Sequence, residues 1–218
     1  MMPSLSEPGG GSPSPCLTDR MNEFLVPFTL FAIAGSITPG PNNIMLTASG
    51  ANFGLRRTLP HLLGVCIGFP VMALMIGLGL GRLFEEVPIA HAVLKVAGSA
   101  YLLWLAFRIA MSGEAEPADA GARPLSFLQA AAFQWVNPKA WIMVSGAIST
   151  FTLAGEAMLP QVLAMVTIFA IVSFPSATIW TLLGVGIARV LRGPMGLRLF
   201  NLAMGALLAA SVLWILIG

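Results

Sequence analysis

The residues with the clearest chemical potential lie in a polar stretch, residues 38–43, that interrupts a long apolar run. Two prolines in it remove backbone donors and obstruct helical hydrogen bonds, so the sequence predicts a break in a helix. The helix that restarts at Pro41 would present its N-terminus, with partial positive charge, beside two asparagines. A carboxylate is the natural guest for such a terminus. A structural kink bridged by neighbouring helices is the alternative. The candidate binding residues here are Thr38, Pro39, Gly40, Pro41, Asn42 and Asn43.

A second interruption lies in residues 134–139, with Gln134, Asn137, Pro138 and Lys139 as candidate binding residues. Lys139 falls near the centre of an apolar segment, where a lysine costs about 2.5–3.5 kcal/mol on insertion scales. No Asp or Glu lies deep in an apolar segment to pair with it. We therefore expect Lys139 to face a hydrated cavity, to lose its proton, or to meet a substrate anion. In the alternative, the helix breaks at Pro138, re-enters and leaves Lys139 at an interface.

The elements that must position these residues are long apolar segments, six of them. They run approximately over 24–49, 59–81, 89–111, 126–153, 159–188 and 197–217. Each is long enough to cross a hydrocarbon core of about 30 Å as a helix. The chain is 57% hydrophobic and only 9% charged, whereas soluble domains average about 25% charged residues. The sequence therefore predicts an all-α, polytopic membrane protein with six transmembrane helices, of which helices 1 and 4 are broken at the proline motifs.

Charge asymmetry between the connections predicts the orientation. The first, third and fifth connections and their flanks hold seven arginines, against three Lys or Arg on the opposite side. We expect the Arg-rich connections in the cytoplasm and both termini outside. If one terminal segment does not fully span, five spans remain. A net charge of +2 is too small to indicate a nucleic-acid partner.

The two halves of the chain, about 21–112 and 124–218, match helix by helix. Segments 1 and 4 are broken at proline, and segments 2 and 5 carry Phe69-Pro70 and Phe174-Pro175. Segments 3 and 6 share a glycine followed by an apolar run, Gly98 and Gly205. Three helices per half is an odd number, so the halves must have opposite orientations. This pattern predicts a 3+3 inverted repeat, which is common in transporters; the alternative is that proline is simply frequent in membrane helices.

The N-terminal residues 1–20 are rich in Ser, Pro and Gly and predict a disordered tail. We hypothesise that the working protein begins at Met21 and that residues 21–218 form a single transmembrane transporter domain. The two cysteines, Cys16 and Cys66, do not indicate a disulfide or redox pair. Paired carboxylates, a Ser-His set and a metal cluster are absent from the sequence pattern. We therefore expect no enzyme, no cofactor and no metal site.

Three stretches of the sequence resemble the LysE/RhtB family of amino-acid exporters. They are TPGPNN at Thr38–Asn43, GSAYLLWLAFRI at Gly98–Ile109 and SFLQAAAFQWVNPK at Ser126–Lys139, with Ser149-Thr150-Phe151 following. The likeness runs from about Met21 to the C-terminus and is strongest to the cysteine and O-acetylserine exporter branch. The resemblance implies a multi-pass exporter of the bacterial inner membrane. Members that export lysine or arginine commonly carry an acidic residue at the position of Asn42, so a cationic substrate is not implied.

Together these observations predict a secondary transporter that exports small, largely neutral amino acids or derivatives. The amino acid would bind between the two breaks. The other functions considered are export of basic amino acids or of another small solute such as a metal ion, and a membrane assembly protein. Glycine-rich helix faces would allow a homodimer. The coupling ion is left open, because no deep carboxylate is present to carry a proton.

Overall fold

The computed structural model describes residues 17–80, 88–112, 123–153, 157–191 and 194–217, and every regular element in these ranges is a helix. The prediction of an all-α protein is confirmed for this part of the chain. The predicted tail lies outside the described residues except for residues 17–20, which are helical. The elements are α1 (Leu17–Ile37), α2 (Pro41–Met75), the π-helical turn η1 (Ile76–Leu80), α4 (Pro88–Ala110), α5 (Phe127–Phe133), the 3₁₀ turn η2 (Gln134–Val136), α6 (Pro138–Phe151), α7 (Met158–Val190) and α8 (Pro194–Ile217).

Three helical stretches are long and apolar enough to cross a membrane: Pro41–Leu80, Met158–Val190 and Met195–Leu213. Two shorter apolar helical stretches, Phe24–Ile37 and Val96–Ala110, accompany them. Large hydrophobic side chains cover the outside of the helices; Leu30 is 62% exposed and Ile171 is 67% exposed. Such an outer surface suits lipid, because helices that satisfy their own backbone hydrogen bonds can enter a bilayer.

Helix α2 consists of two helical stretches that meet at Gly54. The backbone of Gly54 is non-helical, with φ 74° and ψ 168°, a conformation that glycine adopts without the steric cost of a Cβ. Across the bend, the Ser49 hydroxyl lies 3.1 Å from His61 Nδ1. In a straight helix these residues would be about 18 Å apart, so the chain turns back on itself at Gly54. The connection is therefore one residue, and not the polar loop over 50–58 that the sequence suggested.

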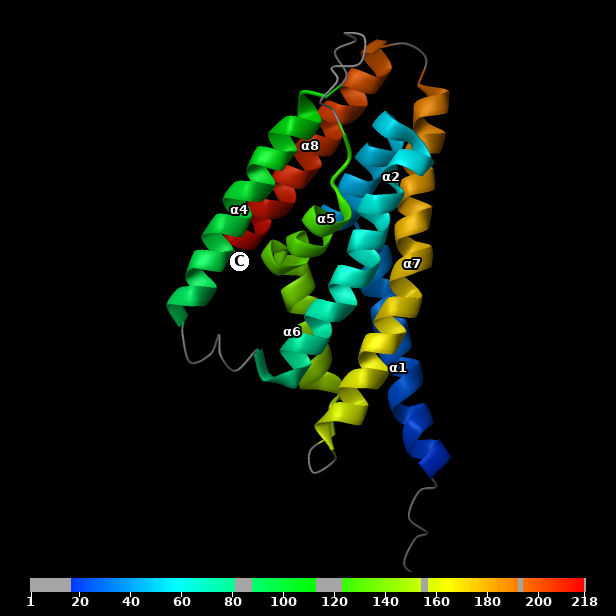
Figure 1. Cartoon of the computed structure of the whole chain (residues 1–218), viewed down its shortest axis with the longest axis vertical. Coiled ribbons are helices and arrows are strands. Elements are labelled where there is room, and N and C mark those ends of the chain that lie inside the picture. The colour runs from blue at the N-terminus through cyan, green and yellow to red at the C-terminus, as the bar shows by residue number, and fades with distance from the viewer. Residues whose placement is uncertain (1–16, 81–87, 113–122, 154–156, 192–193, 218) are drawn as a thin grey trace, which may run out of the picture.

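Small residues bring the helices into close contact with one another. The first stretch of α2 packs against α7, where a Cβ on Gly50 would meet the Thr181 carbonyl and a Cβ on Gly184 would meet the Thr47 carbonyl. Gly64 and Gly68, in the second stretch, face the backbone of α5 in the same way. Helices without bulky side chains at the contact gain more backbone packing in a membrane. Figure 1 shows the resulting bundle, with α2 and α7 alongside each other.

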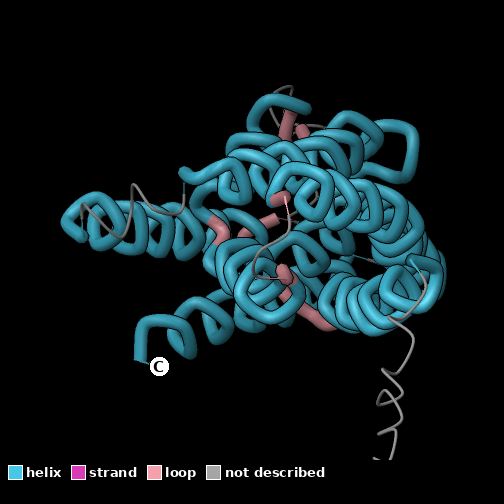
Figure 2. The backbone as a smooth tube through the Cα atoms, turned by 90° about the horizontal axis from the view of Figure 1, so that it is seen from below, coloured by secondary structure: helices cyan, strands magenta, loops and turns pink. Residues whose placement is uncertain are grey.

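The ends of the helices gather at two opposite ends of the bundle. Figure 1 shows the bend within α2, the end of α4, the end of α7 and the start of α8 at the top. The starts of α4 and α7 and the end of α6 lie at the lower end. The view from below shows α4 and α8 extending to one side of the other helices (Figure 2).

Aromatic residues fill the lower part of the bundle, between α1, α2, α6 and α7. Phe28 is completely buried and lies 5.4 Å from Phe151 and 5.1 Å from Phe169, measured between ring centroids. Phe169 in turn contacts Phe69 of α2 at 5.0 Å. Edge-to-face pairs of this kind stabilise beyond the area that they bury. We call these four rings the aromatic cluster.

Candidate functional site

The backbone between α1 and α2, residues 38–40, is not helical, and side chains satisfy the carbonyl groups that this leaves open. The Asn43 amide, which is almost buried, donates to the carbonyl of Ser36 at 2.8 Å and to that of Thr38 at 3.0 Å. The Ser176 hydroxyl of α7 donates to the same Ser36 carbonyl at 2.8 Å. Asn43 therefore holds the end of α1 against the start of α2, and its amide is already committed to the protein.

A second non-helical residue, Asn137, separates η2 from α6. Its φ of −85° and ψ of 104° are extended, and its side-chain oxygen accepts from the Lys139 N–H at 3.2 Å. Asn137 thus caps α6, with Pro138 at the first helical position where a proline costs no hydrogen bond. The N-terminal turn of α6 is oriented by the side chain that precedes it.

Two amide side chains, one beside each non-helical segment, pair reciprocally. Asn42 Nδ2 donates to Gln134 Oε1 at 2.8 Å, and Gln134 Nε2 donates to Asn42 Oδ1 at 3.1 Å. Gln134 is completely buried and also donates to the Ala130 carbonyl at 2.9 Å. Without Asn42, the Gln134 amide would keep its bond to Ala130 but leave its buried oxygen unsatisfied, which costs about 1–3 kcal/mol.

The Lys139 ammonium joins the two non-helical segments directly. Lys139 Nζ donates to the Thr38 carbonyl at 2.7 Å, and the Pro39 carbonyl lies 3.5 Å from it. Gly40 makes room for this side chain, because a Cβ on Gly40 would lie 2.7 Å from Lys139 Cδ. The sequence did not predict this pairing. The Lys139 ammonium, for which no carboxylate partner was found, instead donates to carbonyl groups that follow the end of α1. An ammonium has three donors, so donor capacity remains for a guest.

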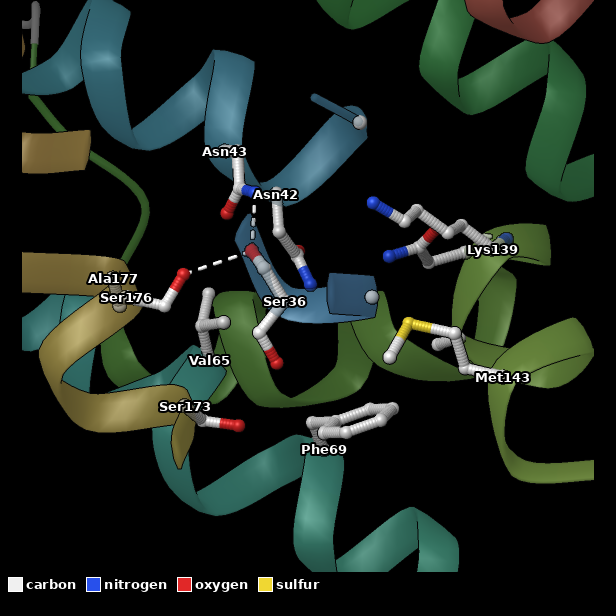
Figure 3. Close-up of a pocket in the computed structure, with 14 residues that line it drawn as sticks. Ser36, Asn42, Asn43, Val65, Phe69, Lys139, Met143, Ser173, Ser176 and Ala177 are labelled. Atoms are coloured by element: carbon white, nitrogen blue, oxygen red, sulfur yellow. Dashed lines mark hydrogen bonds between the residues drawn. The ribbon is translucent and has the colours of Figure 1, made fainter. Parts of the chain in front are cut away.

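A cavity of about 60 Å³ lies between these residues (Figure 3). On this measure one water needs about 10–15 Å³, so there is room for several waters or a small polar group. We call it the break cavity. Five predicted residues line it, namely Gly40, Asn42, Asn43, Asn137 and Lys139. The lining does not include Thr38, Pro39, Pro41, Gln134 or Pro138; Thr38 and Gln134 act through their hydrogen bonds to Lys139 and Asn42.

Sequence reasoning did not select Ser36, Phe69, Met143, Ser173 and Ser176, which also line the break cavity. Figure 3 shows the Phe69 ring and the Met143 side chain beside the opening, with the serines of α7 opposite. The signal for Phe69, Ser173 and Ser176 was the pair of Phe-Pro motifs matched between the halves, because Phe69 belongs to the first motif and the serines flank the second. Ser36 and Met143 had no such signal. The proline motifs mark the turns of α2 and α7 that face the break cavity.

The groups that line the break cavity are chemically complementary to a small zwitterion. The Lys139 ammonium is its charged group. The Ile44 N–H donates to the Gly40 carbonyl at 2.9 Å, and the backbone N–H groups of Asn42 and Asn43 precede it at the N-terminus of α2. These groups favour a carboxylate. Carbonyl and hydroxyl groups of Ser36 and Ser173 suit an ammonium, and Phe69 with Met143 suits an apolar side chain.

Comparison with known proteins gives a consistent set of relatives. The sequence model described as "LysE type translocator" matches residues 33–215. The cysteine/O-acetylserine efflux protein of Escherichia coli strain K12 is 34% identical over 158 residues, which cover 72% of this chain and 80% of the relative. The proteins of the same description from Shigella flexneri and from Escherichia coli O1:K1 are 34% and 33% identical, with the same coverage. No solved structure is significantly similar to this chain.

Proposed function

The chain belongs to the LysE type translocator family, and from this premise we propose that it exports small, largely neutral amino acids, with cysteine and O-acetylserine as the first candidates. The relatives that share a third of their residues with it carry the description of cysteine/O-acetylserine efflux. The proposal places the protein in the bacterial inner membrane as a multi-pass secondary transporter.

One observation carries the proposal: Lys139 Nζ donates to the Thr38 carbonyl at 2.7 Å. This contact joins the non-helical segment 38–40 to the first turn of α6, about a hundred residues away in sequence. Transporters commonly bind solutes where two discontinuous helices from different repeats meet near the bilayer centre. Open backbone is tolerated there only when it lines a cavity or is buried in protein. Gly40 and Asn137 line the break cavity, and the carbonyl of the exposed Thr38 accepts from Lys139 and Asn43.

We propose further that the helices form six spans in a 3+3 inverted repeat. In this arrangement α1 and the first stretch of α2 make one span, broken at residues 38–40, and α5, η2 and α6 make its counterpart in the second half. Both breaks contribute to the break cavity, and the Phe-Pro turns of α2 and α7 complete it. The halves would rock about this site to expose it to each side in turn.

In the proposed bound state the substrate carboxylate lies between Lys139 and the first turn of α2. Its ammonium donates to the Thr38 carbonyl in place of Lys139, while Asn43 keeps its hydrogen bonds to the end of α1. A cationic charge at Lys139 favours a carboxylate and disfavours a cationic side chain, so lysine and arginine are poor candidates. Water in the break cavity supports the ammonium of Lys139 when no substrate is present.

Export from intact cells tests this proposal. Cells that express the protein are loaded with cysteine or O-acetylserine, and the extracellular amino acid is measured over time. We expect the amino acid to accumulate outside cells that express the wild type. Lys139→Ala and Asn42→Ala should each export at least ten times more slowly, which corresponds to a loss of about 1.4 kcal/mol. Ser145→Ala is the matched control, because Ser145 is an exposed residue of the same helix as Lys139.

The amount of each variant in the membrane fraction is measured alongside. Variants that insert normally but do not export support the assigned roles. A wild type that releases no amino acid above cells without it contradicts the proposed function. Export at the wild-type rate by both Lys139→Ala and Asn42→Ala contradicts the proposed site.

A further inference from the structure

A second and larger cavity, of about 390 Å³, lies near the upper end of the bundle, between the first stretch of α2, α4 and the segment leading into α5. Two arginines line it: Arg108 in the last turn of α4 and Arg123 in the extended residues before α5. We call it the arginine cavity. No Asp or Glu is among the described residues that line it. Two cations on the wall of one cavity repel each other, and a guest anion relieves that repulsion.

The arginine cavity is built from positioned side chains. The Arg108 guanidinium lies 5.3 Å from the centre of the Trp104 ring, which fixes it by a cation–π contact. On the α2 side, Asn52 and Asn201 pair reciprocally at 2.8 and 2.9 Å, and Asn201 also donates to the Ser112 carbonyl at 2.8 Å. These bonds tie α2, α4 and α8 together at the edge of the cavity, so its walls are held in place.

A buried polar atom in the wall has no hydrogen-bond partner among the described residues. His61 is 1% exposed and lines the arginine cavity. Its Nδ1 lies 3.1 Å from the Ser49 hydroxyl, while Nε2 is buried without a hydrogen bond to protein. A buried unpaired nitrogen is costly. A polar group of a guest, or a water that the guest retains, would satisfy Nε2.

The arginine cavity adjoins the break cavity along α2. Asn42 lines the break cavity and Met45, three residues later on the same helical face, lines the arginine cavity. On the other side, Gln129 lines the arginine cavity, and Gln134 binds Asn42 beside the break cavity. One turn of α2 therefore separates the two cavities, with Met45 buried in the packed cluster that also holds Leu105 and Phe133.

We propose that the arginine cavity is a loading site, in which Arg108 and Arg123 hold the carboxylate of an amino acid before it moves to the break cavity. A guanidinium presents donors in a planar fork that matches a carboxylate. The amino acid's own polar groups meet the His61 and Ser49 side of the cavity. This inference rests on the proposed function, because the guest of the loading site is the solute that the break cavity exports.

The test uses the full chain in liposomes, with L-cysteine under reducing conditions as the probe and efflux rate as the readout. We expect Arg123→Gln and Arg108→Gln each to raise the KM for L-cysteine about tenfold, the value of one lost charged hydrogen bond, with kcat changed less than threefold. Arg189→Gln is the matched control, because it removes an exposed arginine of the last turn of α7 that does not line the cavity.

Competition with L-cysteinamide, which lacks a carboxylate, shows whether the arginines bind the substrate carboxylate or a lipid phosphate. In the wild type the amide should compete with L-cysteine about ten times more weakly than unlabelled L-cysteine does. In Arg123→Gln and Arg108→Gln that preference should become smaller, because only Lys139 then binds the carboxylate, in liposomes with and without anionic lipid. If the arginine variants keep the wild-type KM and preference, or if the change occurs only with anionic lipid, the loading site is refuted.

Folding and the proposed function are separated by two further measurements. Arg123 is exposed and lies in the extended segment before α5. If Arg108→Gln fails to insert, Arg123→Gln alone decides whether the loading site exists. A wild type that moves no amino acid in liposomes refutes the proposed function, and the inference with it. A wild type that transports, Lys139→Ala that does not, and arginine variants that match the wild type refute the loading site alone.

Discussion

At the scale of single residues, the polar groups of the break cavity are divided between structure and binding. Asn43 is occupied by two carbonyls of the α1 end, so its role is to hold the non-helical segment. Lys139 makes one strong hydrogen bond, to Thr38, and has donors to spare. The division explains why side-chain amides and one lysine are present in an apolar bundle: they replace the backbone partners that residues 38–40 have lost.

The position of the Lys139 ammonium depends on Gly40, and this gives a prediction. The backbone of Gly40 is extended, with φ −175°, so alanine can adopt it, but its Cβ would lie 2.7 Å from Lys139 Cδ and displace that flexible side chain. We expect Gly40→Ala to slow export about tenfold with a Tm close to that of the wild type. Export and the thermal unfolding of purified protein are the measurements.

Gly146→Ala, on the same helix as Lys139, is the control, because nothing lies within 4 Å of a Cβ at Gly146. It should leave both export and Tm unchanged. Normal export by Gly40→Ala would show that Lys139 can move without consequence, and its assignment as the carboxylate-binding group would then be wrong.

At the scale of elements, glycines and prolines decide how the helices meet. Gly50 and Gly184 let the first stretch of α2 approach the backbone of α7. The Thr47 hydroxyl donates to the Trp180 carbonyl at 3.1 Å within the same contact. This contact fixes one wall of the break cavity, since Ser176 of α7 donates to the Ser36 carbonyl beside it.

Two glycines of α7 test the close approach as a matched pair. We expect Gly184→Ala to lower the free energy of unfolding by about 1–3 kcal/mol, the usual cost of overpacking, because the new methyl group meets the Thr47 carbonyl and the backbone at Ala51. Gly186→Ala, two residues on, has nothing within 4 Å and should be neutral or slightly stabilising. Thermal unfolding in detergent measures both; equal Tm values would contradict the packing described.

The sequence predicted the elements more completely than their contacts. Each predicted apolar segment coincides within a few residues with helical structure, because long apolar runs in a membrane have helices as the stable form.

The Gly54 bend was not predicted, because a single glycine in a polar stretch does not distinguish a one-residue turn from a loop. The Asn42–Gln134 pair and the Lys139–Thr38 contact were not predicted either, since they depend on how distant segments pack. Both segments were nevertheless chosen as candidate sites, because prolines and amides in an apolar run mark a backbone that needs partners.

At the scale of the whole molecule, the two ends of the bundle differ in chemistry. Helices α4 and α7 end at the top of Figure 1, with Arg108 and Arg189 in their last turns, and the end of α4 lines the arginine cavity. Phe69, which lines the break cavity, belongs to the aromatic cluster together with Phe28, Phe151 and Phe169. A solute therefore meets charged and polar walls from one end, and packed rings from the other. This asymmetry suits one-way loading from the arginine-rich end.

The orientation that this implies is testable by labelling from each side of the membrane. In a variant with Cys16→Ser and Cys66→Ala, single cysteines replace Arg57, Arg189, Leu153 or Met158, all of which are exposed. Because arginine-rich ends face the cytoplasm and α7 is long enough to span, a membrane-impermeant thiol reagent should reach Arg57→Cys and Arg189→Cys only from the cytoplasmic side. Leu153→Cys and Met158→Cys should react only from outside, since they precede α7 or begin it. Arg57 and Arg189 belong to different halves, so their labelling from opposite sides would contradict the inverted repeat as well as the orientation.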